Sequence, residues 1–211
     1  MIRKLSALAA SAALVFAATF AHAGERVDPT IGEPAPQFSL TDVVTGQPVS
    51  LADFKGKTVV IAFQSINCPW DKMRESGGYQ RYLAPLSQEY SGQNVQFLGI
   101  NANKNETIDE IGSYHQEHAI PYPILKDTDN IIADAYNAKT TPHIYVIAPD
   151  EAQTLVYMGG VEQVPTSPEV CGQMDENYLV PVLTAVLAGE EVPYTKTTSK
   201  GCGIKRVSKA E

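Results

Sequence analysis

Cys68 is the residue in this sequence with the strongest potential for chemistry. It follows an apolar run, 59–63, closes the stretch Ser65-Ile-Asn-Cys68 and is followed by Pro69. A cysteine thiolate is a nucleophile and a metal ligand. Dithiol sites often place a second cysteine three residues further on, but Asp71 occupies that position here. The motif indicates a single nucleophilic thiol without a local partner, the alternative being a buried structural cysteine.

The remaining two cysteines lie far downstream of Cys68. Cys171 ends a polar loop, and Cys202 lies between two glycines, which let the backbone approach another surface closely. Cys202 is a candidate to resolve an oxidised Cys68, the alternative being an ordinary tail thiol. Cys171 is a second candidate, unless it bonds to Cys202 and leaves Cys68 alone. The sequence does not choose between these pairings.

The elements around Cys68 follow from local patterns. The run 57–63 is apolar on both faces, as a buried central strand requires. Pro69 suits the first position of a helix, with Gly77 and Gly78 bending its early turns. A helix N-terminus at Cys68 would lower the pKa of the thiol, whereas the Asp71 carboxylate would raise it.

The rest of the chain alternates strands and helices, which predicts an α/β fold. We expect a thioredoxin-like arrangement: a mixed, mostly parallel sheet covered on both faces, with an N-terminal hairpin and a C-terminal extension. The expected strands are two within 37–51, then 94–101, 122–127 and two within 143–160; the expected helices are 105–118, 129–137 and 178–187.

The first 23 residues have the features of a secretory signal peptide. Arg3 and Lys4 precede an apolar stretch, and Ala21-His22-Ala23 is a cleavage pattern. The predicted domains are this peptide (1–23), a redoxin domain (24–163) and a helix-and-tail extension (164–211). We expect a periplasmic or secreted protein that is not an integral membrane protein after cleavage. The net charge of −8 argues against a nucleic-acid partner.

Three stretches carry a resemblance to a known family: "IGEPAPQFSLTD", "TVVIAFQSINCPW" and "TTPHIYVI". Together they resemble the thioredoxin-like superfamily, in its redoxin or AhpC/TSA (peroxiredoxin-like) branch, over residues 30–163. The tail "LAGEEVPYTKTTSKGCGIKR" is similar to the extension of an atypical group that ends in Gly-Cys-x-Ile-Lys.

The resemblance implies roles for individual residues. Cys68 falls at the position of the thiolate that attacks a peroxide, and Ser65 takes the place of a threonine whose hydroxyl donates to that thiolate or to the peroxide. Pro142 matches a cis-proline that lies beside the cysteine. With Thr141, Pro69 and Trp70 it forms the expected substrate site, although core packing is the favoured role for Trp70 taken by itself.

The leading interpretation is an exported thiol-dependent oxidoreductase. It would act on a peroxide or disulfide substrate, take electrons from an external thiol reductant, and need no cofactor and no metal. Two alternatives stay open: a non-catalytic module that binds copper or a partner protein through Cys68 and His143, and a monothiol redox sensor. The family's peroxide-polarising arginine has no counterpart between Arg81 and Arg206, which favours the alternatives.

Overall fold

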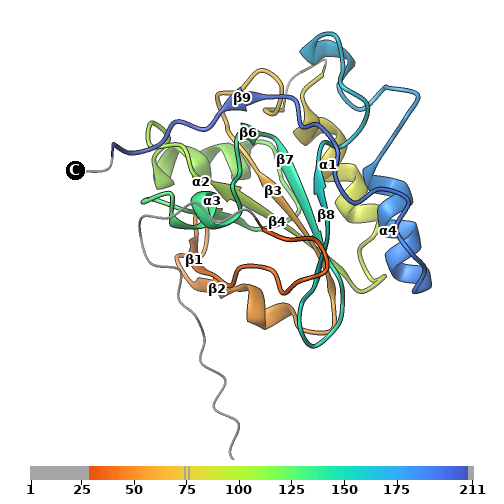
Figure 1. The fold of residues 1–211 in the computed structure, drawn as a ribbon. Helices are drawn as coiled ribbons and strands as arrows, with labels where there is room; N and C mark the ends of the chain where they lie inside the picture. The colour runs from red at the N-terminus through yellow and green to blue at the C-terminus, as the bar shows by residue number, and fades with distance from the viewer. Residues whose placement is uncertain (1–28, 74, 76, 209–211) are drawn as a thin grey trace, which may run out of the picture.

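The computed structural model describes residues 29–73, 75 and 77–208, so the predicted signal peptide lies outside the described part (Figure 1). The strands are β1 (Ser39–Asp42), β2 (Pro48–Ser50), β3 (Thr58–Phe63), β4 (Val95–Asn101), β5 (Ile124–Lys126), β6 (Thr140–Thr141), β7 (His143–Ile147), β8 (Leu155–Gly159) and β9 (Cys202–Gly203). The helices are α1 (Tyr79–Glu89), α2 (Ile108–Glu117), α3 (Ile131–Ala135) and α4 (Leu179–Ala188), with short 3-10 helices η1 (Leu51–Phe54) and η2 (Pro168–Val170).

Seven strands form one mixed sheet in the order β2-β1-β5-β4-β3-β7-β8. Only β3–β4 and β4–β5 are parallel pairs, and the other four pairs are antiparallel. The α/β class and the mixed sheet are therefore confirmed, as is the N-terminal hairpin. Parallel pairing is less extensive than expected, because β7 runs antiparallel to β3 and β1 runs antiparallel to β5.

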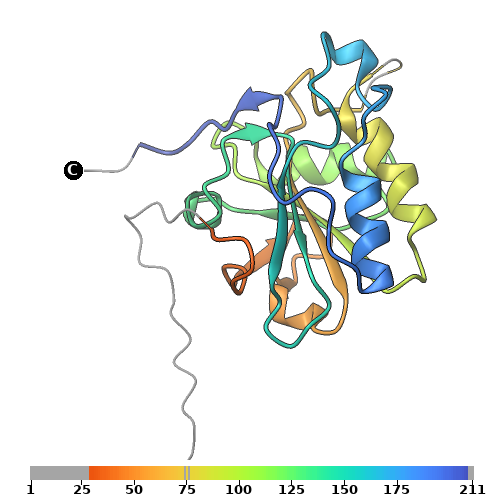
Figure 2. The same ribbon diagram turned by 45° about the vertical axis from the view of Figure 1, so that its right-hand side comes forward.

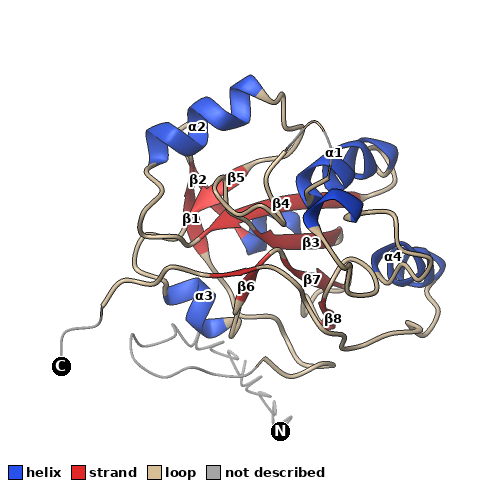
Figure 3. Cartoon of the chain, turned by 90° about the horizontal axis from the view of Figure 1, so that it is seen from above, coloured by secondary structure: helices blue, strands red, loops and turns tan. Residues whose placement is uncertain are grey.

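The central strand β3 separates two apolar clusters. Val60 and Ala62 belong to the cluster that receives α1, α2 and α4, whereas Ile61 and Phe63 belong to the cluster that receives α3 and η1. Successive residues of a strand point to opposite faces, so this alternation places helices on both sides of the sheet (Figure 3). The wholly apolar interior of β3 is what allows both faces to be covered.

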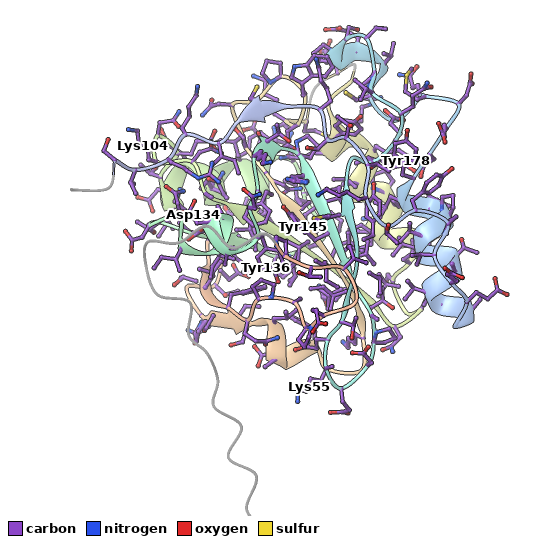
Figure 4. The ribbon with its side chains drawn as sticks, in the orientation of Figure 1. Lys55, Lys104, Asp134, Tyr136, Tyr145 and Tyr178 are labelled. Atoms are coloured by element: carbon purple, nitrogen blue, oxygen red, sulfur yellow. The ribbon has the colours of Figure 1, made fainter. Side chains whose placement is uncertain are left out.

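Two tyrosines pack against each other close to β6 in the chain: Tyr136, just after α3, and Tyr145, within β7. The Tyr145 hydroxyl donates to the carbonyl of Tyr136 at 2.8 Å, and their rings meet edge to face with centroids 5.0 Å apart (Figure 4). Both side chains are fully buried. This packing fixes the position of the chain segment that carries Thr141 and Pro142.

The C-terminal segment folds back over the sheet. From α4 the chain crosses the end of the sheet where β6 lies, and β9 pairs antiparallel with β6 there (Figures 1 and 2). We call residues 195–207 the strap. Within the described part of the chain, no helix is long and apolar enough to cross a membrane.

Candidate active site

Cys68 lies in the loop after β3, within a single helical turn. Its carbonyl accepts hydrogen bonds from the N–H groups of Asp71 and Lys72, at 3.0 and 2.9 Å. The chain then leaves this turn, and the N–H of Tyr79 at the start of α1 donates to the carbonyl of Trp70 at 3.0 Å. The turn is therefore stacked on the N-terminal end of α1 without being continuous with it.

The prediction of a helix starting at Pro69 is therefore wrong, because α1 begins at Tyr79. Gly77 and Gly78 have φ angles of 80° and 79°, which favour glycine. A Cβ on Gly78 would lie 2.0 Å from the Lys72 carbonyl oxygen. These glycines let the chain return close to the turn, and they interrupt the helix that the spacing of apolar residues had suggested.

Ser65 and Glu106 organise the backbone in front of Cys68. The Ser65 hydroxyl donates to Glu106 Oε1 at 2.6 Å, and its oxygen accepts from the N–H of Cys68 at 3.1 Å. The expected hydrogen bond from Ser65 to the thiol is therefore replaced by one to a carboxylate. Glu106 was not predicted from the sequence, although it follows β4, whose carboxyl end lies beside that of β3.

The Cys68 thiol is enclosed by two other segments. It donates to the carbonyl of Thr141 at 3.1 Å, and Sγ accepts from the N–H of Cys202 at 3.2 Å. Thr141 and Cys202 are paired residues of β6 and β9, and the Thr141–Pro142 bond is cis, as predicted. The structure thus brings together Cys68, Thr141, Pro142 and Cys202, and it leaves Cys68 only 2% exposed.

The environment of Cys68 stabilises the neutral thiol. Burial raises the pKa of the Cys68 thiol to about 12, and the hydrogen bond with the Cys202 side chain and the nearby Asp71 carboxyl act in the same direction. The pKa lowered by a helix N-terminus is therefore a wrong prediction for this conformation. The helix itself is absent at this position, and the strap excludes water from the sulfur.

Asp71 lies under the turn and is fully buried. Its Oδ2 accepts from the N–H of Ser65 at 2.5 Å, whereas Oδ1 is a buried atom without a hydrogen-bond partner among the described residues. Burial raises the pKa of the Asp71 carboxyl well above its usual value. Asp71 thus occupies the place of a second thiol as a buried acid that braces the Cys68 turn.

Cys171 contacts the backbone of the turn that carries Cys68. Its Sγ is 3.8 Å from the carbonyl oxygen of Trp70, and burial raises the pKa of its thiol to about 11. All three cysteines are free thiols in this structure, so the alternative bond between Cys171 and Cys202 is not formed. Of the two candidate partners, it is Cys202 that contacts Cys68.

The strap is held along its length by backbone contacts. Its first part pairs with β8, where the N–H of Thr197 donates to the Met158 carbonyl at 3.1 Å. Its middle part is β9, and a Cβ on Gly201 would lie only 2.0 Å from the Thr141 carbonyl oxygen. The close approach of the strap to β6 therefore depends on glycine at this position.

Side chains fasten the strap at both ends of the site. Lys200 Nζ lies 4.8 Å from the centre of the Trp70 ring, a cation–π distance. Arg206 Nε donates to Asp134 Oδ1 at 2.9 Å. Trp70 is half-buried under the strap, whereas Pro69 is exposed beside it.

His143, the second residue of the copper-binding alternative, contacts Tyr145. Its Nδ1 lies 3.1 Å from the Tyr145 hydroxyl, and burial lowers the pKa of the imidazole to about 4. Among the described residues no three His, Cys, Asp or Glu side chains are grouped to hold a metal ion. These observations give no support to the copper-binding alternative.

A thioredoxin-like sheet with a buried thiol beside a cis-proline defines the molecule as a thiol redoxin. The AhpC/TSA family model matches residues 31–157, more than half of the chain, so the protein belongs to the AhpC/TSA family.

The named relatives include both a thiol-disulfide oxidoreductase and a "Putative peroxiredoxin". "Thiol-disulfide oxidoreductase ResA" of Bacillus subtilis is 26% identical over 128 residues, which are 61% of this chain and 67% of that one. "Putative peroxiredoxin bcp" of Coxiella burnetii is 30% identical over 107 residues, or 50% of this chain and 65% of that one. The crystal structure of a hypothetical protein from Sinorhizobium meliloti has a TM-score of 0.73 at 29% identity, covering 87% of this chain and 98% of its own.

Proposed function

We propose that this protein is an exported thiol oxidoreductase of peroxiredoxin-like type, in which Cys68 attacks a peroxide or a disulfide and Cys202 resolves the product. The observation that carries the proposal is the contact of the Cys202 N–H with Cys68 Sγ at 3.2 Å. Membership of the AhpC/TSA family and the names of its relatives support it. The likeness to the Sinorhizobium structure extends over more of the chain than the family match, in keeping with an atypical group that shares the tail.

The chemistry uses only sulfur to carry electrons. With a peroxide, the Cys68 thiolate breaks the O–O bond, becomes a sulfenic acid and releases an alcohol or water. The Cys202 thiol then displaces the sulfenic oxygen as water, which leaves a Cys68–Cys202 disulfide. Two molecules of an outside thiol return two electrons and two protons and leave as their own disulfide.

A disulfide substrate requires the same two residues. The Cys68 thiolate forms a mixed disulfide with one half of the substrate and releases the other half as a thiol. Cys202 then attacks Cys68 Sγ, which frees the second half and again leaves the Cys68–Cys202 disulfide. The separation of the thiols therefore matters in both reactions, whichever substrate is used.

The strap must open before an outside substrate reaches Cys68. In the closed structure the side chain is 2% exposed, and the pKa of its thiol is about 12. Release of β9 from β6 would expose the sulfur and remove the main cause of the raised pKa. We therefore assign the closed form to the resting dithiol and the reactive form to a strap-open state.

The test is cysteine mapping after oxidation. The reduced protein is treated with one equivalent of hydrogen peroxide or of glutathione disulfide, quenched over time, and digested for mass spectrometry. We expect a Cys68–Cys202 disulfide in the original chain and in a Cys171→Ser variant. In a Cys202→Ser variant we expect Cys68 to stop at the sulfenic acid or the mixed disulfide.

Two results would contradict the proposal. If Cys68 stays reduced for hours with both oxidants, the protein is not a thiol oxidoreductase that uses Cys68. A Cys68–Cys171 disulfide as the main product would keep the nucleophile and replace the resolving partner.

A further inference from the structure

Glu106 is a buried carboxylate that uses all of its acceptor capacity on the approach to Cys68. Its side chain is 2% exposed. Oε1 accepts from the Ser65 hydroxyl at 2.6 Å and from the N–H of Asn67 at 3.2 Å. Oε2 accepts from the N–H of Ile66 at 3.2 Å and from Asn101 Nδ2 at 2.5 Å. Three of the four donors thus belong to the three residues before Cys68.

The link from Glu106 to Cys68 runs through the Ser65 hydroxyl. Because the hydroxyl proton points to Glu106, the oxygen lone pairs face the N–H groups of Cys68 and Asn67, at 3.1 and 3.2 Å. A hydroxyl carries one proton, so its direction decides which neighbours it can serve as an acceptor. The carboxylate therefore sets the orientation that holds the backbone of Cys68.

The same loop also holds the strap. Asn103 Oδ1 accepts from the N–H of Lys205 at 2.9 Å, and the N–H of Lys104 donates to the Lys205 carbonyl at 2.8 Å. Lys126 Nζ joins the loop together by donating to the carbonyls of Asn103 and Glu106, both at 2.7 Å. The loop 103–106 thus contacts the three residues before Cys68 and also Lys205, which follows Cys202 in the strap.

We infer that Glu106 is the positioning residue that sets the arrangement of Cys68 against Cys202 and thereby the reduction potential of that pair. The inference rests on the proposed function, since it concerns the disulfide formed there. A dithiol held in one arrangement loses less freedom when the bond forms, so the loop favours the disulfide. Glutamine does not replace the carboxylate, because its NH₂ group would face the N–H of either Ile66 or Asn67.

The test is equilibration of the protein with glutathione and glutathione disulfide, followed by quantitative cysteine mapping. The protein dithiol gives two electrons and two protons to glutathione disulfide, which yields the Cys68–Cys202 disulfide and two glutathione molecules. In Glu106→Gln we expect the equilibrium constant to fall at least about tenfold, a potential about 30 mV more oxidising. The matched control is Glu110→Gln, an exposed carboxylate that caps α2 nearby, for which we expect a change within about twofold.

A role limited to fold stability predicts a different pattern. It would lower the unfolding temperatures of the reduced and oxidised forms equally and leave the potential unmoved. A Ser65→Ala variant provides a second route if Glu106→Gln does not fold, because it cuts the same connection. We expect a similar fall, partly restored by Ser65→Thr, and a double variant that loses no more than the more affected single one.

The outcomes separate this inference from the function on which it rests. An original chain that forms a Cys68–Cys202 disulfide, with Glu106→Gln and Ser65→Ala both within about twofold of its equilibrium constant, overturns the inference alone. Single effects that add fully in the double variant also overturn it. An original chain that forms no such disulfide overturns the proposed function, and the inference falls with it.

Discussion

At the scale of single residues, the structure shifts the pKa of the Cys68 thiol upward, opposite to the shift expected from a helix N-terminus. Because the pKa of the Cys68 thiol is raised to about 12, almost all of the protein carries the neutral thiol at pH 7. An ordinary cysteine, with a pKa of about 8.5, is a thiolate in a few per cent of molecules. The closed form therefore protects Cys68 from oxidants in two ways: the thiol stays protonated, and the strap covers the sulfur.

This protonation predicts the pH dependence of alkylation. We expect the rate at which iodoacetamide modifies Cys68 to rise about tenfold per pH unit from pH 7 to 10 without a plateau, because only the thiolate reacts. Since the folded-state pKa is raised, Cys68 stabilises the fold below the ordinary thiol pKa, and this contribution is lost as the pH rises through the folded value. Site-specific mass spectrometry measures the rate, with urea-unfolded protein as the control. A plateau below pH 8 in the folded protein would contradict the assignment.

A substitution of Asp71 tests which cause of the raised pKa of the Cys68 thiol is dominant. Asp71→Asn removes the carboxyl but keeps an oxygen for the N–H of Ser65. Burial is the leading cause of the Cys68 shift and Asp71 a lesser one, so we expect alkylation at pH 8 to speed up by less than about tenfold. A larger increase would mean that the buried carboxyl, rather than burial, controls the thiol.

At the scale of elements, the strap controls access to the thiol. Its contact with β6 requires glycine at 201, because a Cβ there would lie 2.0 Å from the Thr141 carbonyl oxygen. Nothing lies within 4 Å of a Cβ placed on Gly203, one residue beyond Cys202. The two glycines that flank Cys202 therefore offer a matched pair of substitutions.

Gly201→Ala is expected to open the strap. The added methyl group must displace backbone, so β9 separates from β6 and Cys68 becomes exposed. We expect alkylation of Cys68 at pH 8 to rise at least about tenfold, whereas Gly203→Ala should match the original chain. Equal rates for the two variants would show that β9 does not protect the thiol.

Local sequence signals predicted most elements correctly. The helix expected within 105–118, which begins with a capping box of Thr107 and Glu110, and the strand expected within 57–63 are confirmed because each depends on neighbours along the chain. The helix at Pro69 was wrong because a return of the chain at Gly77 and Gly78 is not visible in apolar spacing. β9 was missed since two residues paired with a distant strand carry no periodic pattern.

Part of the site could be predicted because some of its residues lie in motifs formed by neighbours along the chain. Cys68 and the cis Thr141–Pro142 bond belong to recognisable local motifs. The network around Glu106 joins residues 39 to 41 positions apart through hydrogen bonds, and in the sequence Glu106 is indistinguishable from part of a helix start. The contact of its carboxylate with residues 65–67 is recognised only in the structure, where the ends of β3 and β4 lie side by side.

At the scale of the whole molecule, export from the cytoplasm is part of the proposed function. The basic start, apolar stretch and Ala-His-Ala pattern of residues 1–23 support this part of the proposal. Expression of the full chain in a bacterium should yield a mature protein in the periplasmic fraction or the medium that begins at Gly24, as measured by intact mass. A full-length chain retained in the cytoplasm would contradict export.

Cys68 and Cys202 are 134 positions apart in the chain. A covalent bond between them would enclose most of the sheet, including β4, β5, β7 and β8, in one closed loop. In the chain-entropy model, a crosslink spanning ~100 residues stabilises a fold by about 4 to 5 kcal/mol, because the unfolded chain loses freedom.

The oxidation state of the proposed pair would therefore set the heat resistance of the whole domain. Calorimetry should show the disulfide form unfolding at a higher temperature than the dithiol form, and Cys202→Ser should remove the difference. Equal unfolding temperatures in both states of the original chain would contradict this. Such a domain would resist unfolding most in its oxidised form, before a reductant reaches it, and would unfold more easily after each reduction.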